Sequence, residues 1–165
     1  MIWKIDPRAR VTIHPGVRIH SGPRVNAFGG HRPAIIWVLP GGRLTIGPGA
    51  GISSSTLVCQ RELTIGARVM IGGACEIVDT DFHPHDARSR ALHEQAPVRT
   101  AAVDIQEDAW VGGRVMILKG VTIGAGAIVG AGSVVPRTVP AAEVWAGNPA
   151  HPIRGAAPRA DGGVL

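Results

Sequence analysis

The chain has 165 residues, of which 45% are hydrophobic, and it contains 23 Gly, 13 Pro and 2 Cys. This length and apolar content favour one folded domain with a full core and exclude a disordered chain. We find no apolar run long enough to span a bilayer, and residues 1–6 do not read as a signal peptide, so we expect a cytoplasmic protein without a membrane span. We expect Cys59 and Cys75 to be small buried residues rather than a disulfide or reactive thiols.

Charge is distributed unevenly along the chain, whose formal net charge is +5. Residues 4–61 hold eight Lys or Arg and only one acid, Asp6, whereas seven of the twelve acids lie between Asp79 and Asp108. The arginines are scattered singly and lack interleaved aromatic residues, which argues against nucleic-acid binding. A solvated basic surface of this kind suits an anionic small molecule or a polysaccharide.

The first third of the chain contains six-residue units of the type Val-Thr-Ile-His-Pro-Gly. After a lead-in at residues 1–10, which we expect to be an edge strand or an N-terminal cap, the units predict that Ile13, Ile19 and Val25 face inward. Residues 26–33 break the pattern. Residues 34–39 are strongly apolar and predict a buried strand, which ends at the Pro-Gly-Gly turn of residues 40–42.

The repeat resumes at Leu44 and continues to Ile77. The inward positions are Ile46, Ile52, Val58, Ile65, Ile71 and Ile77. A slip of one residue near Gln60 separates the first three from the last three and predicts a bulged corner.

Residues 78–102 interrupt the repeat with a polar segment. This excursion contains His83, His85, Asp86, His93 and Glu94. A long excursion from a rigid repeat is usually functional.

The most regular part of the chain runs from Val103 to Val135. Every sixth residue is Ile or Val, and the residue two positions earlier is usually smaller. Residues two apart on a strand point to the same face, so each unit places both side chains inward. The inward pairs are Val103 and Ile105, Ala109 and Val111, Val115 and Ile117, Val121 and Ile123, Ala127 and Val129, and Ser133 and Val135.

A period of six predicts short strands separated by sharp bends, with three units closing one triangular coil. Gly112, Gly124 and Gly130 follow three of the large inward residues, where a Cβ would obstruct the chain. Stacked coils should pair through parallel strands and bury a column of Ile and Val. The pattern therefore predicts an all-β solenoid and leaves the hand of the coil open.

The repeat stops at Pro136. We expect a last strand near residues 142–146, a short capping turn or helix at residues 148–154, and a disordered tail at residues 155–165. Residues 1–154 should form a single β-helix domain.

Several motifs occur together in this chain. These are Val78-Asp-Thr-Asp-Phe-His-Pro-His-Asp, Trp110-Val-Gly-Gly within residues 108–126, Gly130-Ala-Gly-Ser-Val-Val, and Ala146-Gly-Asn-Pro-Ala. Their order and spacing resemble the hexapeptide-repeat acyltransferases, in particular the maltose, galactoside and polysaccharide O-acetyltransferases. The resemblance covers about residues 44–154. It implies a left-handed parallel β-helix, a homotrimer with sites between neighbouring subunits, and acetyl-CoA as the acyl donor, with no metal.

The resemblance also implies a direct transfer of the acetyl group to a hydroxyl of the acceptor. His83 matches the general base of the family, and imidazole is well suited to accept a proton near neutral pH. Asp81 and His83 share a face if the excursion is extended, so Asp81 is our candidate for orienting His83 or binding a substrate hydroxyl, although Asp79 remains open. Ser53, Ser54 and His85 are further candidates for substrate binding.

Other matching positions imply contacts with CoA. Gly112, Gly113 and Ala131 would let the pantetheine arm approach the backbone closely. Trp110 matches the Trp that lines the cleft at the subunit boundary, although trimer packing is an alternative role. Arg154 matches a basic residue at the nucleotide end, and Lys119 and Arg137 are further candidates.

Other readings of the repeat remain open. A γ-type carbonic anhydrase would need three His ligands for zinc, and residues 103–135 supply none. A non-catalytic scaffold would leave the polar excursion unexplained. An antibiotic or serine-type acceptor is the alternative to a sugar. The residues of the chain do not identify the acceptor.

Overall fold

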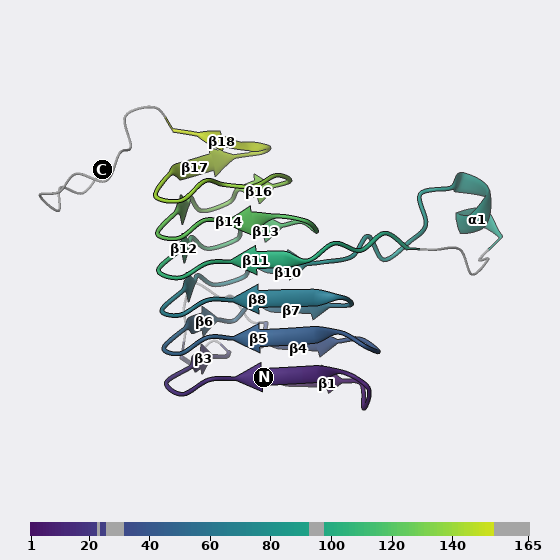
Figure 1. Cartoon of the computed structure of the whole chain (residues 1–165), viewed down its shortest axis with the longest axis horizontal. Helices are drawn as coiled ribbons and strands as arrows, with labels where there is room; N and C mark the ends of the chain where they lie inside the picture. The colour runs from purple at the N-terminus through teal and green to yellow at the C-terminus, as the bar shows by residue number, and fades with distance from the viewer. Residues whose placement is uncertain (23, 26–31, 93–97, 154–165) are drawn as a thin grey trace, which may run out of the picture.

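The chain folds into a three-sided parallel β-helix from which one arm projects (Figure 1). The computed structural model describes residues 1–22, 24–25, 32–92 and 98–153. Successive coils add one strand to each of three sheets, and every pairing between the coils is parallel. The three sheets of parallel strands confirm the predicted all-β fold class, and the coil is left-handed, as the resemblance implies.

The three sides of the coil are three sheets, which we number in chain order. The first sheet contains β1 (Ile2–Ile5), β4 (Ile35–Val38), β7 (Thr56–Cys59), β10 (Glu76–Val78), β13 (Met116–Ile117) and β16 (Val134–Val135). The second contains β2 (Arg10–Ile13), β5 (Arg43–Ile46), β8 (Glu62–Ile65), β11 (Val103–Ile105) and β14 (Thr122–Ile123). The third contains β3 (Arg18–His20), β6 (Gly51–Ser53), β9 (Met70–Ile71), β12 (Trp110–Val111), β15 (Ile128–Val129), β17 (Val144–Gly147) and β18 (Ala150–Pro152).

The interior is the column of buried aliphatic side chains that the repeat predicts. All six large inward residues from Ile105 to Val135 are 0% exposed, and their smaller partners from Val103 to Ser133 are at most 1% exposed. The parallel register aligns like with like between coils, as in Ile65 beside Ile105 and Ile105 beside Ile123. Each coil is thus covered by the same kind of side chain above and below, which explains why the pattern repeats without a miss.

Gly112, Gly124 and Gly130 permit close contact between coils. A Cβ on Gly112 would lie 2.7 Å from the backbone N of Ala131, and one on Gly124 would overlap the backbone of Ala141. None of the three has the left-handed backbone conformation that favours glycine. The predicted obstruction is therefore confirmed. Its cause is the backbone of the next coil at Gly112 and Gly124, and the Cβ of Ala146 at 2.8 Å at Gly130.

This close approach gives a stability prediction. We expect Gly124→Ala to lower the free energy of unfolding by about 1–3 kcal/mol, because the new methyl group must displace backbone rather than a flexible side chain. Gly51→Ala is the matched control, since a Cβ there meets nothing within 4 Å. Urea unfolding at one protein concentration compares the two. Equal midpoints for both variants and the parent would contradict the prediction.

The phase slip near Gln60 has a clear structural cause. Asp79 is 0% exposed, and its carboxylate accepts hydrogen bonds from the backbone N–H groups of Gln60, Arg61 and Glu62 at 2.7, 2.7 and 2.8 Å. A buried carboxylate thus satisfies the amides of the bulged corner. Cys59 lies beside this corner, and burial, together with the negative charge of Asp79, raises the pKa of its thiol to about 12.

The cysteine prediction is confirmed. Cys59 and Cys75 are both free and buried. Burial also raises the pKa of the Cys75 thiol.

One prediction for the ends of the coil is wrong. Val25 lies in a turn and is 60% exposed, because the chain has left the third sheet before it. The expected capping turn is present at residues 148–149, and the chain then continues into strand β18, which pairs antiparallel with β17. Ile13 lies in register with buried Ile46 as predicted, yet it is 44% exposed because its coil is covered from one side only.

The strand predicted at residues 34–39 is confirmed as β4, and the lead-in at residues 1–10 supplies β1, which pairs with it. The expected tail at residues 155–165 lies outside the described residues. In the part of the chain that the structure describes, no helix is long and apolar enough to cross a membrane.

Candidate functional site

The polar excursion forms an arm at the corner between the first and second sheets (Figure 1). Its two ends pair as a short stem, in which Thr80 forms an antiparallel bridge with Thr100 and the N–H of Asp81 donates to the carbonyl of Arg99 at 3.1 Å. The arm carries the helix α1 (Ala87–Ala91), whose N-terminus is capped by the carboxylate of Asp86. The stem holds the His-rich segment away from the coil.

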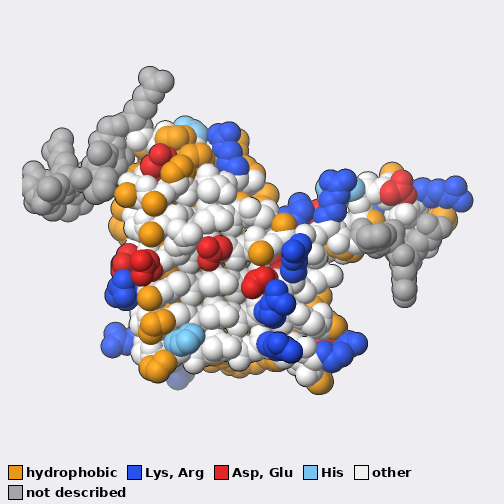
Figure 2. Space-filling model, in the orientation of Figure 1, with side chains coloured by type: hydrophobic (Ala, Val, Ile, Leu, Met, Phe, Trp, Pro, Cys, Tyr) orange, Lys and Arg blue, Asp and Glu red, His pale blue; other side chains and the backbone are white. Residues whose placement is uncertain are grey.

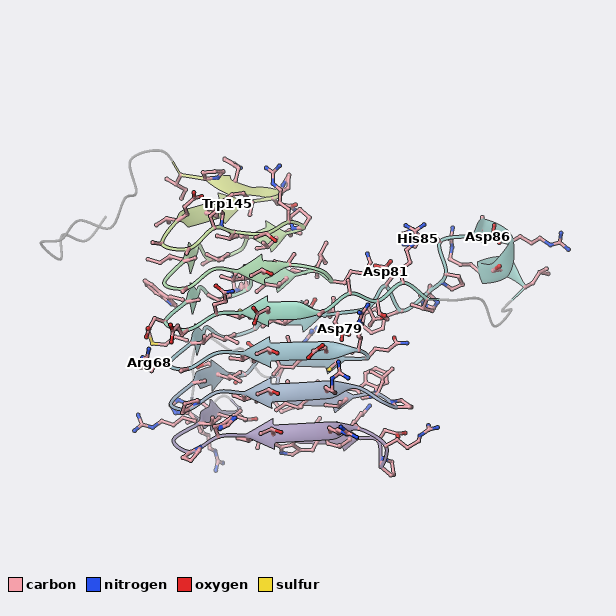
Figure 3. All side chains as sticks on the ribbon, viewed as in Figure 1. Arg68, Asp79, Asp81, His85, Asp86 and Trp145 are labelled. Atoms are coloured by element: carbon pink, nitrogen blue, oxygen red, sulfur yellow. The ribbon has the colours of Figure 1, made fainter. Side chains whose placement is uncertain are left out.

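A cluster of three charged or titratable side chains fastens this arm to the coil. Lys119, at the corner after β13, places its Nζ 2.7 Å from Oδ1 of Asp81. Nε2 of His85 lies 2.6 Å from Oδ2 of Asp81, and Figure 3 labels these two residues on the arm. The hydrogen bond from Lys119, with a further one from His85, holds the pKa of Asp81 below its ordinary value. Asp81 is therefore charged at neutral pH, and both of its oxygens are engaged.

His83 is exposed beside this cluster. Its backbone N–H donates to the carbonyl of Asp81 at 2.7 Å, while its ring makes no hydrogen bond to any residue that the structure describes. Within one chain, Asp81 contacts His85 and Lys119, and Asp79 is occupied at the bulged corner. Neither carboxylate orients His83 in the single chain. Figure 2 shows Lys and Arg side chains along the arm and on the coil near its base.

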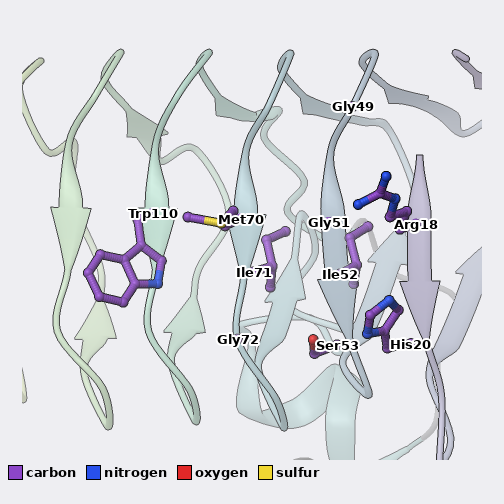
Figure 4. Close-up of a pocket in the computed structure, with 10 residues that line it drawn as sticks. All are labelled: Arg18, His20, Gly49, Gly51, Ile52, Ser53, Met70, Ile71, Gly72 and Trp110. Carbon is purple, nitrogen blue, oxygen red and sulfur yellow. The ribbon is translucent and has the colours of Figure 1, made fainter. Parts of the chain in front are cut away.

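A second set of candidate residues lines a cleft of about 380 Å³ on the outer face of the third sheet (Figure 4). The parallel register places Arg18, Gly51, Met70 and Trp110 in one row across four neighbouring strands, with His20 beside Ser53 in the next row. Met70 is 57% exposed and Trp110 is 50% exposed. The cleft thus has an apolar end at Trp110 and a basic end at Arg18.

Ser53 and Ser54, although adjacent, lie in different environments. Ser53 is half-buried and lines the cleft. Ser54 is 2% exposed, and its hydroxyl accepts a hydrogen bond from the N–H of Gly22 at 3.1 Å. The structure therefore brings Ser53 together with Trp110 and leaves the Ser54 hydroxyl inside the corner.

The small residues implied for CoA binding line the corner between the third and first sheets. Gly112 donates its N–H to the carbonyl of Val129, and its missing Cβ allows Ala131 to lie close. Among the described groups, the amides of Gly113 and Ala131 have no acceptor. The hydrogen bonds between the described coils therefore leave these two amides unused.

The basic candidates for CoA binding lie apart from these small residues. Lys119 is paired with Asp81 at the base of the arm. Arg137 stacks its guanidinium over the ring of Trp145, with 5.4 Å from Cζ to the ring centroid. Arg154 lies outside the described residues.

The candidate residues therefore fall on two sides of one chain. His83, Asp81, His85 and Lys119 lie at the corner between the first and second sheets, whereas Ser53 and Trp110 lie on the third sheet, on the other side of the coil (Figure 1). The arm points away from the coil, so one chain does not bring His83 to its own cleft.

Sequence reasoning missed Arg18, His20 and Met70 as neighbours of Trp110. The six-residue pattern does indicate that all three side chains face outward. The break at residues 26–33 and the slip at Gln60 change the count, so the pattern could not show which outward residues share a row.

Comparison with known proteins gives a consistent result. Residues 102–137 match the bacterial transferase hexapeptide (six repeats) family. The chain is 36% identical over 104 residues to the galactoside O-acetyltransferase of Lactococcus lactis, an overlap of 61% of this chain and 48% of that protein.

Solved structures agree with this relationship. A hexapeptide-repeat acetyltransferase of Vibrio cholerae, solved with acetyl-CoA, has a TM-score of 0.66 and 28% identity over 87% of this chain and 69% of its own. A galactoside acetyltransferase in complex with coenzyme A has a TM-score of 0.63 and 27% identity over 85% of this chain and 64% of its own. The resemblance to hexapeptide-repeat acyltransferases is thus confirmed.

Two further findings complete the description of the site. The chain spans about half the length of the curated relatives it matches, 42% and 48% for the first two. Within residues 1–22, 24–25, 32–92 and 98–153, no group of three or more His, Cys, Asp or Glu side chains is arranged to hold a metal ion.

Proposed function

Because the chain resembles hexapeptide-repeat acyltransferases in both sequence and fold, we propose that it transfers an acetyl group from acetyl-CoA to a hydroxyl of a sugar or polysaccharide. The names of its relatives support the acyl donor and the type of acceptor. The polar arm supports an enzyme over a non-catalytic scaffold, since a scaffold does not require an exposed His-rich segment.

The main observation behind the proposal is that, within one chain, His83 and the cleft lie on different sides of the coil. Three copies around a threefold axis parallel to the coil would bring the arm of one copy towards the third sheet of the next. Exposed Met70 and Trp110 on that sheet also favour burial at an interface between copies. We therefore propose a homotrimer with one site at each boundary between subunits.

His83 supplies the acid–base chemistry in this proposal. Its imidazole accepts the proton of the acceptor hydroxyl while the hydroxyl oxygen attacks the thioester carbonyl. Collapse of the tetrahedral adduct breaks the C–S bond, and the imidazolium returns the proton to the departing thiolate. Asp81 contributes indirectly, because its bonds to Lys119 and His85 fix the base of the arm that carries His83.

The donor is bound along the corner between the third and first sheets. The amides of Gly113 and Ala131 donate to the pantetheine carbonyls, and Gly112 leaves room for the arm to lie close to the backbone. This path runs from the coil of Trp110 towards the C-terminal end. It leaves the cleft between Arg18 and Trp110 open for the acceptor.

Mixing two inactive variants tests the proposal. His83→Ala removes the base from the arm, and Trp110→Ala removes the wall of the cleft, so each pure trimer should acetylate sugars at a small fraction of the parental rate. Random trimers assembled from both variants contain sites that take intact His83 from one copy and intact Trp110 from the next. About one site in four is then complete, and roughly a quarter of the parental activity should return.

The control is a single inactive variant refolded alone through the same procedure. The readout is thiol release from acetyl-CoA in the presence of a sugar panel, with light scattering to confirm trimers of the 17.1 kDa chain. Mixed trimers as inactive as either parent variant would show that the site lies within one chain. A monomeric mass would reject the trimer itself.

A further inference from the structure

From the charge of the cleft we infer the class of acceptor, namely a sugar that carries a carboxylate or phosphate group, bound through Arg18. This inference rests on the proposed function for the identity of the reaction. It goes beyond that function by assigning a specificity-determining residue, which the motifs do not include.

The shape of the cleft comes from a missing side chain. Arg18, Gly51, Met70 and Trp110 form one outward row across β3, β6, β9 and β12, and Gly51 is the only member without a side chain (Figure 4). Two strand spacings of about 4.8 Å put the backbones at Arg18 and Met70 roughly 10 Å apart, and no side chain rises from Gly51 between them. This gap belongs to the cleft of about 380 Å³, which has room for a sugar ring.

The polar groups of the cleft are arranged for a charged sugar. Ser53 and His20 lie next to the gap and can bind ring hydroxyls, while Met70 and Trp110 offer an apolar wall to a sugar face. Arg18 ends the row, and its guanidinium can bind a carboxylate or phosphate through two parallel hydrogen bonds.

The charge balance of this surface favours an anion. Within one chain, no acidic residue lines the described cleft. Arg68, at the neighbouring corner, is already paired with Asp108 and Glu107. Among the described residues Arg18 has no acidic partner, so its charge is available to a ligand.

Matched acceptors test the inference. Methyl glucuronide and methyl glucoside differ only at C6, where a carboxylate replaces the hydroxymethyl group. Glucose 1-phosphate supplies the phosphate alternative and keeps the C6 hydroxyl. We expect the parent trimer to prefer at least one of the two anionic sugars by at least about tenfold in kcat/KM over methyl glucoside. Whichever anionic sugar is preferred identifies the source of the charge.

Variants then connect this preference to the residue. Arg18→Gln should remove the preference, so that within this variant kcat/KM for the preferred anionic sugar falls to about that for methyl glucoside. Arg10→Gln is the matched control, since Arg10 is an exposed cation of the same coil on the second sheet and should preserve the preference. Gly51→Val fills the gap and should weaken all three sugars by about tenfold or more.

The outcomes separate this inference from the proposed function. Equal use of neutral and anionic sugars by the parent, or an unchanged preference in Arg18→Gln, would overturn the inference alone. If no sugar is acetylated, the proposed function fails, and calorimetry of methyl glucuronide and glucose 1-phosphate decides the inference. Binding that weakens about tenfold in Arg18→Gln supports it, and equal or undetectable binding overturns it.

Discussion

His83→Ala is expected to lower kcat by at least about a hundredfold, while the variant folds, assembles and binds acetyl-CoA as the parent does. Loss of a general base typically slows a reaction by about 10²–10⁴-fold. His83 is exposed on the arm and its ring makes no hydrogen bond to the described residues, so truncation should cost the fold little. Steady-state kinetics, calorimetry with acetyl-CoA and light scattering measure the three properties separately.

Two further His variants make this result specific. His14→Ala is the control, because His14 is exposed at a corner of the first coil, far from the arm, and its loss should leave kcat unchanged. His85→Ala tests the alternative base, since the contact between His85 and Asp81 could orient that imidazole instead. An inactive His85→Ala beside an active His83→Ala would move the base to His85 and show that the motif alignment is displaced.

Asp79→Ala is expected to lower the free energy of unfolding by about 3 kcal/mol or more. The substitution leaves the N–H groups of Gln60, Arg61 and Glu62 without their acceptor, and each unsatisfied buried donor costs about 1–3 kcal/mol. The bulged corner would also lose the group that holds its extra residue in place. Urea unfolding at a fixed protein concentration measures the loss.

Two variants bracket this effect. Asp79→Asn keeps the shape of the side chain and one acceptor oxygen, so its loss of stability should be smaller. Asp104→Ala is the matched control, because Asp104 lies on the outer face of the second sheet with one long contact, 3.4 Å to Gln106. Unfolding of Asp79→Ala at the same urea concentration as Asp104→Ala would show that the carboxylate is not needed at the corner.

The regular part of the fold could be predicted because each coil places the same kinds of side chain in the same surroundings. A residue such as Ile117 is covered by its equivalents in the coils above and below, so a period of six is enough to place it inside. The same logic failed at Val25, where the chain leaves the sheet, and at β18, which pairs antiparallel with β17 rather than starting a new coil. Such segments lie where the repeat breaks or ends, so the six-residue period gives no information about their structure.

The candidate site was predictable only in part, for a related reason. The motifs singled out His83, Ser53 and Trp110, but they could not show that His83 and Trp110 lie on different sides of one chain. The pairing of Asp81 with Lys119 and His85 depends on how the stem of the arm meets a corner one coil further on. Proximity in sequence suggested His83 as the partner of Asp81, and the geometry of the stem selected the other two.

The sequence by itself determined the regular strands, most of the inward faces and the polar arm, since these follow from side-chain alternation and from hydrogen bonding between neighbouring coils. It was wrong for Val58, which was expected to face inward but lies in the outward row with Trp37, while Leu57 and Cys59 face the core. Only the tertiary structure decided that Arg18 and Trp110 share one cleft. It also decided that the carboxylate of Asp79 accepts hydrogen bonds from a corner of the coil below. The physical reason is register. The slip at Gln60, the break at residues 26–33 and the arm each shift the count of residues, and only the stacking of the completed coils restores which side chains meet.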